Sequence, residues 1–229
     1  MSFLGHVGVV AGKDLRIELR SREILFNMVF FSAMAVVLFS FAFLKEGRDG
    51  AMVAVAEITP GFLWVAVLFS ATMGMARAFD RERESDTMRG LLLSPIPRAA
   101  LFLGKAVGLF ALMALVEAVV VPLCWFFFGA PIFDDPVALV ALVVLATLGI
   151  SVVGAVFAAM LMKTRARDLL LPVILYPILT PLFIAAIKAT SAMLMGADDQ
   201  VWFWIRFLVV YDASFLVAAL WIFESLVIE

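Results

Sequence analysis

The sequence predicts an all-α membrane protein with six transmembrane helices, and two observations carry this prediction. Hydrophobic residues make up 65% of the 229 residues, whereas soluble domains contain about 45–50%. The chain also has six apolar runs, each near the roughly 20 residues that a helix needs to cross a bilayer. We place these spans at about 25–44, 57–76, 101–128, 137–161, 169–188 and 203–223. Because no stretch remains for a soluble domain, residues 1–229 are expected to form a single transmembrane domain.

Residues 3–23, which precede the first span, mix apolar and charged side chains. Apolar residues such as Val7 and Val10 are interleaved with charged ones such as Lys13 and Arg16. This pattern predicts an amphipathic helix that lies in the membrane interface, with a loosely ordered tail as the alternative. A signal peptide is not expected, because the apolar run that follows is too long and lacks a clear small-residue cleavage site.

The second span begins with a proline and a glycine, Pro60 and Gly61, followed by Trp64 in the same run. Proline removes a backbone donor and disfavours a straight helix. We therefore expect the start of this span to be loosened. These three residues are candidates for a translocation path or a gate.

A strongly charged interval follows the second span. Residues 77–89 carry eight charges in thirteen positions: Arg77, Asp80, Arg81, Glu82, Arg83, Glu84, Asp86 and Arg89. Opposite charges three residues apart favour a helix, and this helix would be polar on nearly every side as far as Met88. Such a helix usually bridges two bodies rather than filling a core. The prediction is a surface helix that docks another protein, and the alternative is a solvated loop.

Two carboxyl groups fall inside predicted spans. Glu117 lies near the middle of the third span, and Asp212 occupies a similar place in the last one. An ionisable group at this depth is costly in lipid, so each should face a helix interface or a wet cavity. A functional role and a structural hydrogen bond both remain open for each residue, and the two carboxyls could share one path.

The fifth span contains three prolines, Pro172, Pro177 and Pro181, with Tyr176 beside the second of them. Helices with such breaks are tolerated where neighbouring groups or water satisfy the freed carbonyls. The span is a candidate for a gate that bends, with Tyr176, Pro177 and Pro181 as its residues. A static kink is the alternative.

Lysine and arginine residues predict the orientation. The N-terminal segment, the second loop with its flank and the fourth loop together hold 13 of the 17 basic residues, and the other side holds the remaining 4. The positive-inside rule then places both termini and the charged interval in the cytoplasm. The formal net charge of −2 gives no reason to expect nucleic-acid binding.

Several sequence signatures are absent from the 229 residues. There is no G-x-x-x-x-G-K-[ST] phosphate loop, no H-E-x-x-H zinc motif and no G-x-S-x-G nucleophile motif. His6 is the only histidine and Cys124 the only cysteine, so neither a histidine-rich metal site nor an internal disulfide can form. The chain is therefore not expected to be an enzyme, and any ATP it depends on should be hydrolysed by a partner.

Two stretches resemble the haem exporter protein B family (CcmB), whose members are membrane subunits of the ABC transporter in cytochrome c maturation. They are PGFLWVAVLFSATMGMARAFDRERESDTMRGLLLSPIPRAALFLGK at 60–105 and TRARDLLLPVILYPILTPLFIAAI at 164–187. The resemblance implies an ABC-2-like permease in the bacterial inner membrane. It also implies a second copy of the chain, cytosolic ATPase subunits that bind ATP, and membrane partners that handle haem. Haem is then the possible substrate, with no cofactor held by this chain itself.

The resemblance also places the charged interval where such permeases carry the helix that couples to the ATPase. The coupling candidates are Phe79, Asp80, Arg81, Arg83, Glu84, Asp86 and Arg89. In this family a partner subunit carries a tryptophan-rich haem-handling motif. No such motif is evident in this chain, and we interpret Trp202 and Trp204 as an interfacial belt. Two alternatives stay open: an ABC-2 type permease for another lipid-like or drug-like substrate, and a non-transporting scaffold that couples ATP hydrolysis to release of haem from a chaperone.

Overall fold

The computed structural model describes residues 2–43, 51–77, 97–161, 164 and 167–226. Within these ranges the chain forms seven α-helices and no strand. The helices are α1 (Phe3–Ser21), α2 (Glu23–Phe43), α3 (Ala51–Arg77), α6 (Arg98–Phe128), α7 (Pro136–Met160), α8 (Arg167–Leu194) and α9 (Asp198–Leu226). All of them except α1 are long and apolar enough to span a membrane. These six helices confirm the predicted all-α, six-span architecture.

Three ends differ most from the predicted spans. The second spanning helix, α3, begins at Ala51 and not at 57. The other two ends flank Gly196. The fifth spanning helix, α8, continues past residue 188 to Leu194, and the sixth, α9, already begins at Asp198. Polar residues at these ends lower the hydropathy of the sequence there without stopping the helix. Gly196 separates the two helices with a positive φ of 69°, and the two aspartates in the first turn of α9 favour a helix N-terminus.

Side-chain caps fix other helix ends. The Ser2 hydroxyl accepts a hydrogen bond from the Gly5 N–H at 3.3 Å and begins α1. The Asp135 carboxylate accepts from the N–H groups of Val137 and Ala138 at 3.1 and 3.0 Å, and so begins α7. Each cap satisfies backbone donors that have no partner within the helix.

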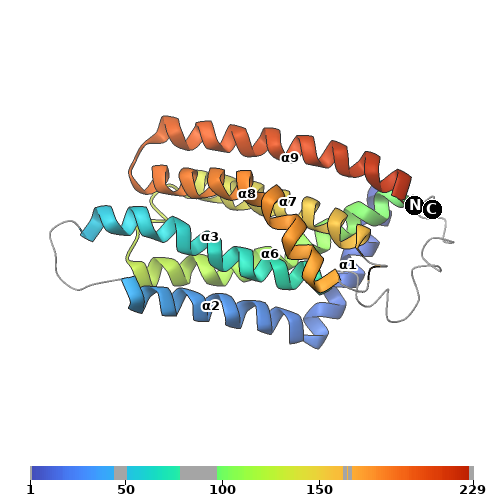
Figure 1. Ribbon diagram of the computed structural model, residues 1–229, viewed down its shortest axis with the longest axis horizontal. Coiled ribbons are helices and arrows are strands. Elements are labelled where there is room, and N and C mark those ends of the chain that lie inside the picture. The colour runs from blue at the N-terminus through green and yellow to red at the C-terminus, as the bar shows by residue number, and fades with distance from the viewer. Residues whose placement is uncertain (1, 44–50, 78–96, 162–163, 165–166, 227–229) are drawn as a thin grey trace.

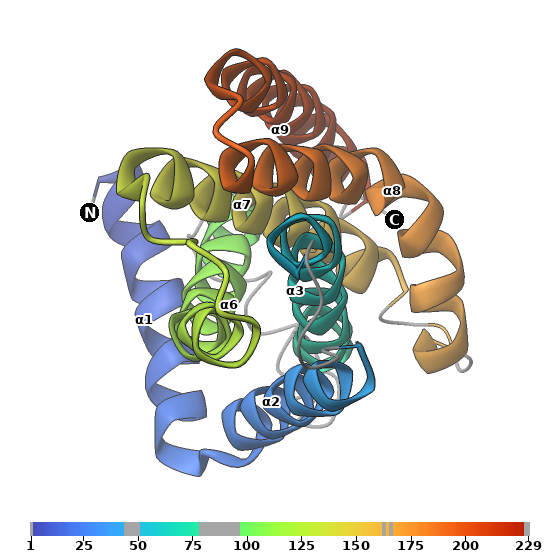
Figure 2. The same cartoon turned by 90° about the vertical axis from the view of Figure 1, so that its left-hand side faces the viewer.

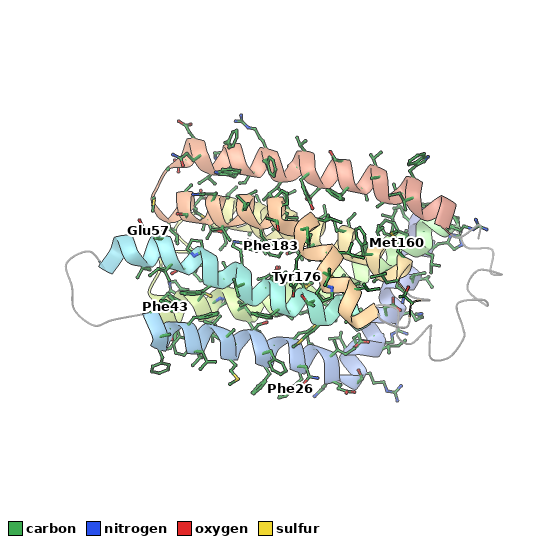
Figure 3. All side chains as sticks on the ribbon, in the orientation of Figure 1. Phe26, Phe43, Glu57, Met160, Tyr176 and Phe183 are labelled. Atoms are coloured by element: carbon green, nitrogen blue, oxygen red, sulfur yellow. The ribbon has the colours of Figure 1, made fainter. Side chains whose placement is uncertain are left out.

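The six spanning helices form one elongated bundle, and α1 runs across it at one end (Figures 1 and 2). Both termini lie at that end, where α3 also ends and α6 begins (Figure 1). Helices α3 and α7 form the interior: α3 packs against α2, α6, α7 and α8, and α7 packs against α3, α6, α8 and α9. Much of α2 and α9 faces outward. Phe26 on α2, for example, is 67% exposed and points away from the bundle (Figure 3).

Helix α1 is docked on α6 through two glycines spaced four residues apart, Gly104 and Gly108. A Cβ added to Gly104 would lie 2.5 Å from the Cβ of Val10, so only glycine permits this approach. One added to Gly108 would lie 3.6 Å from the Cβ of Asp14, an ordinary contact. Small residues at this spacing let two helices pack closely. The Lys105 ammonium lies 2.9 Å from the Asp14 carboxylate and completes the contact.

Candidate functional site

Polar side chains buried between the spanning helices are the starting point for a functional site. Lipid offers them no hydrogen bonds, so each must find a partner in the protein or remain costly. In the described part of the chain, the buried polar residues of the spans are Ser32, Ser40, Thr59, Ser70, Lys105, Glu117, Thr147, Ser151, Thr190 and Asp212. Only two of these are carboxylic acids, Glu117 and Asp212, and both were predicted from the sequence to be candidates.

Glu117 on α6 has a partner on α7. The Thr147 hydroxyl oxygen lies 2.8 and 2.6 Å from the two carboxyl oxygens of Glu117, and 2.6 Å from the carbonyl of Val143. A threonine hydroxyl has one proton to donate, so it can serve only one of these acceptors at a time. This cluster joins α6 to α7 and gives Glu117 a structural hydrogen bond.

Asp212 on α9 is 4% exposed, and neither of its carboxyl oxygens has a hydrogen-bond partner among the residues that the structure describes. It lies against Gly149 of α7 and Leu182 of α8, because a Cβ added to Gly149 would collide with the Asp212 carboxyl and the Leu182 side chain. The absence of a side chain at position 149 thus makes the space that the carboxyl occupies. Within the part of the chain that the structure describes, this acid is buried and no group donates a hydrogen bond to it.

Helix α7 lies between the two carboxyls. Thr147 faces Glu117 and Gly149 faces Asp212. Residues two positions apart on an α-helix point about 200° away from each other. The two acids therefore contact α7 from different sides, and the structure does not bring them together.

The proline-rich helix α8 is continuous but changes direction along its length (Figures 1 and 2). Pro181 has no N–H to reach the carbonyl of Pro177, and its ring disturbs the turn before it. The Tyr211 hydroxyl of α9 donates to the next carbonyl, that of Ile178, at 2.8 Å. This bond anchors α9 to the proline turn of α8, one residue past the carbonyl that Pro181 leaves without its usual N–H donor.

Trp64 and Tyr176, two of the predicted gate residues, both join α3 to α8. The Trp64 indole N–H donates to the Thr190 hydroxyl at 2.9 Å, and its ring packs edge-on against Phe183. The Tyr176 hydroxyl lies 3.2 Å from the Thr72 hydroxyl. Figure 3 shows Tyr176 and Phe183 where α8 passes α3. Trp64 is 1% exposed, so it fills the interior of the bundle.

Pro60 and Gly61 lie inside α3 without interrupting it. Pro60 is buried and Gly61 is half-buried, and a Cβ added to Gly61 would meet no atom within 4 Å. The expected loosening of this span is therefore not visible as a break in the helix.

The hydrogen-bond partners of these residues were not among the predicted candidates. Thr147 pairs with Glu117, Thr190 with Trp64 and Thr72 with Tyr176, and Gly149 makes room for Asp212. The only sign of these partners in the sequence was the presence of hydroxyl residues within the apolar runs. Sequence position does not show which helix each of them faces, so the pairs could not be assigned.

The predicted coupling residues, Phe79, Asp80, Arg81, Arg83, Glu84, Asp86 and Arg89, lie outside the described residues. Cys124 is free and buried in α6. In the described ranges, no three His, Cys, Asp or Glu side chains form a group that could hold a metal ion.

Six long apolar helices packed around buried carboxyl groups define a multi-pass membrane protein. The model of the CcmB protein family matches residues 7–226, and the chain belongs to this family. It is 29% identical to Heme exporter protein B of Pseudomonas aeruginosa over 192 residues, which cover 84% of this chain and 83% of that protein. It is also 27% identical to Heme exporter protein B of Paracoccus denitrificans over 82% of this chain and 84% of that protein. Identity to the Haemophilus influenzae protein of the same name is 26%, over 79% of each chain.

Proposed function

We propose that this chain is the membrane subunit of a haem export transporter that serves the maturation of c-type cytochromes. The observation that carries the proposal is the family match over residues 7–226, which includes all six spanning helices. Relatives that align with about four fifths of the chain are named for haem export. Haem is the cargo in this proposal, not a resident cofactor.

ATP hydrolysis is assigned to a separate cytosolic subunit, since the 229 residues contain no phosphate-binding loop. The charged residues from Asp80 to Arg89, with Phe79, would form the surface that contacts this ATPase. A second copy of the chain and membrane subunits that handle haem complete the proposed assembly, which lies in the bacterial inner membrane.

The proposed orientation places both termini in the cytoplasm. It rests on the distribution of basic residues, 13 against 4. An even number of spans and the position of both termini at one end of the bundle support it (Figure 1). The start of α6 and the end of α3 share that end, so the charged interval between them would also be cytoplasmic.

Cysteine labelling tests this orientation. In intact cells a cysteine at position 49 or 199 should react with a membrane-impermeant maleimide, whereas a cysteine at position 85 should react only after the cells are opened. The parent chain is the control, because its only cysteine, Cys124, is buried and should stay unlabelled. Labelling of position 85 in intact cells would contradict the proposed orientation. It would also exclude docking of the charged interval on a cytosolic ATPase.

Purification of the tagged chain from its native host tests the assembly. We expect an ATPase and haem-handling subunits to co-purify with it. Reversing two charges, Asp80→Lys with Glu84→Lys, should leave membrane insertion intact but reduce ATPase recovery, because truncating or reversing buried interface charges costs about 2–5 kcal/mol. Phe79→Ala should act in the same direction.

The matched control for this experiment is Asp198→Lys with Asp199→Lys, an exposed acidic pair at the opposite end of the bundle. This pair should leave ATPase recovery unchanged. Equal recovery from the parent and from the Asp80 and Glu84 variant would show that the charged interval is only a solvated loop.

Within the membrane, we propose that Asp212 is the acid with a functional role, and that Glu117 is held mainly for its bond to Thr147. Asp212 is buried without a donor in the described residues, so its retention is not explained by structural bonding. Tyr176, Pro177 and Pro181 remain candidates for a bend in α8 that changes during transport. Pro60 and Gly61 stay candidates on α3.

A non-transporting scaffold is the second candidate function. The observation that favours it is that His6, the only histidine, lies in α1 and not in a spanning helix. No histidine is therefore available within the spans to bind haem iron. Haem flux into vesicles that contain the purified complex distinguishes the two: ATP-dependent flux supports transport, and ATP hydrolysis with haem release but no flux supports the scaffold.

A further inference from the structure

The docking of α1 on α6 turns the acidic side chains of α1 toward the bundle and leaves basic side chains on its opposite side. The sequence of α1 alone does not show this arrangement. Both acidic residues of this helix turn inward: Asp14 lies 2.9 Å from the buried Lys105 ammonium of α6, and Glu18 is 8% exposed. Val10 and Ala11 are buried on the same side. In the structure Val10 and Asp14 are the residues of α1 that lie against Gly104 and Gly108, and this contact defines the rotation of the helix.

The opposite side of α1 is basic. Arg16 and Arg20 are exposed, and the Lys13 side chain remains 43% exposed although its ammonium lies 3.2 Å from Asp14. These residues are spaced three and four positions apart, which places them on one side of a helix. We call Lys13, Arg16 and Arg20 the basic face of α1. Past the helix, Arg22 and Glu23 are both exposed and offset each other in charge.

The basic face points sideways from the bundle. In Figure 2, α1 lies on the perimeter with α6 inside it, so the side of α1 opposite α6 looks away from the other helices. Helix α1 also crosses the end of the bundle, near the ends of the apolar spans (Figure 1). At this level a sideways-facing surface meets the headgroups of the surrounding lipid leaflet.

We propose that the basic face of α1 binds the phosphate groups of anionic phospholipids. Lysine and arginine residues held at the surface of an anionic leaflet are attracted by its negative potential. Asp14 is 18% exposed and is paired with both Lys13 and Lys105, and Glu18 is 8% exposed, so little acidic surface faces those lipids. An acidic protein surface is the competing occupant, but a cytosolic partner would approach along the bundle axis, and the basic face does not point that way.

The test uses the full-length protein in nanodiscs that contain equal amounts of phosphatidylglycerol and phosphatidylcholine. After transfer to detergent, native mass spectrometry counts the lipids of each class that stay bound. Replacing Lys13, Arg16 and Arg20 together by glutamine should reduce retained phosphatidylglycerol by at least about threefold, since three cations near an anionic surface are lost. Retained phosphatidylcholine should not change.

The matched control keeps the charge and changes the shape: Lys13→Arg with Arg16→Lys and Arg20→Lys should retain phosphatidylglycerol like the parent. Glutamine has a helix propensity close to that of lysine and arginine, so the neutral variant should fold. The single change Arg16→Gln should give a smaller loss of retained phosphatidylglycerol, and it replaces the triple variant if that variant is poorly produced.

Unchanged phosphatidylglycerol retention in the neutral variants would overturn the proposal. Loss of ATPase co-purification with unchanged lipid retention would assign the face to a protein partner and overturn it as well. This inference does not depend on the proposed transport function.

Discussion

Replacing Trp64 with alanine should lower the free energy of unfolding of the purified protein by about 3–5 kcal/mol, the usual cost of truncating a large buried aromatic side chain. The indole is 1% exposed and donates to Thr190 across the contact between α3 and α8. Its removal leaves a cavity and takes away the aromatic ring that packs against Phe183. Chemical unfolding in detergent measures the change.

Two further variants locate the origin of this effect. Trp64→Phe keeps most of the volume and removes the hydrogen bond, so its cost should be only about 0.5–1.5 kcal/mol. Trp221 on α9 is 79% exposed, and Trp221→Ala should change the stability by less than about 0.5 kcal/mol. If Trp64→Ala left stability unchanged but altered transport, Trp64 would be a gate residue and not a packing residue.

Replacing Asp212 with leucine should make the protein more stable and less active. Burial of a polar group without a hydrogen bond costs about 1–3 kcal/mol in proteins, and leucine has a similar branched shape without the polar oxygens. We therefore expect the free energy of unfolding to rise by that amount. Because functional groups are often retained at the expense of stability, we also expect c-type cytochrome yield to fall in a host that depends on this variant.

Glu117→Leu is the matched control for this prediction. Glu117 is bonded to Thr147, so its removal loses a hydrogen bond worth about 0.5–1.5 kcal/mol and should not stabilise the protein. Asp212→Asn keeps the size of the side chain and removes its charge, which separates the need for an ionisable group from the need for a polar one. Full cytochrome c yield with Asp212→Leu would show that the carboxyl has no role in transport.

The number of spanning helices and the class of the protein followed from the sequence. Hydropathy depends on local composition, and a run of about 20 apolar residues has few alternatives to a membrane helix. The prolines at 172, 177 and 181 lie inside a single helix as expected. The two quoted stretches, 60–105 and 164–187, were enough to indicate the family that the match over residues 7–226 shows.

The pairing of side chains between helices was decided only by the tertiary structure. Trp64 and Thr190 are 126 residues apart, and Glu117 and Thr147 are 30 apart. Nothing in the sequence joins them, because a spanning helix is apolar on every side and its composition does not show which side faces inward. The rotation of each helix is set by close packing at small residues such as Gly104 and Gly149. That rotation leaves Asp212 without a donor in the described residues, and it turns the basic face of α1 outward. The proposed role of Asp212 and the proposed binding of anionic lipids therefore both depend on helix rotation.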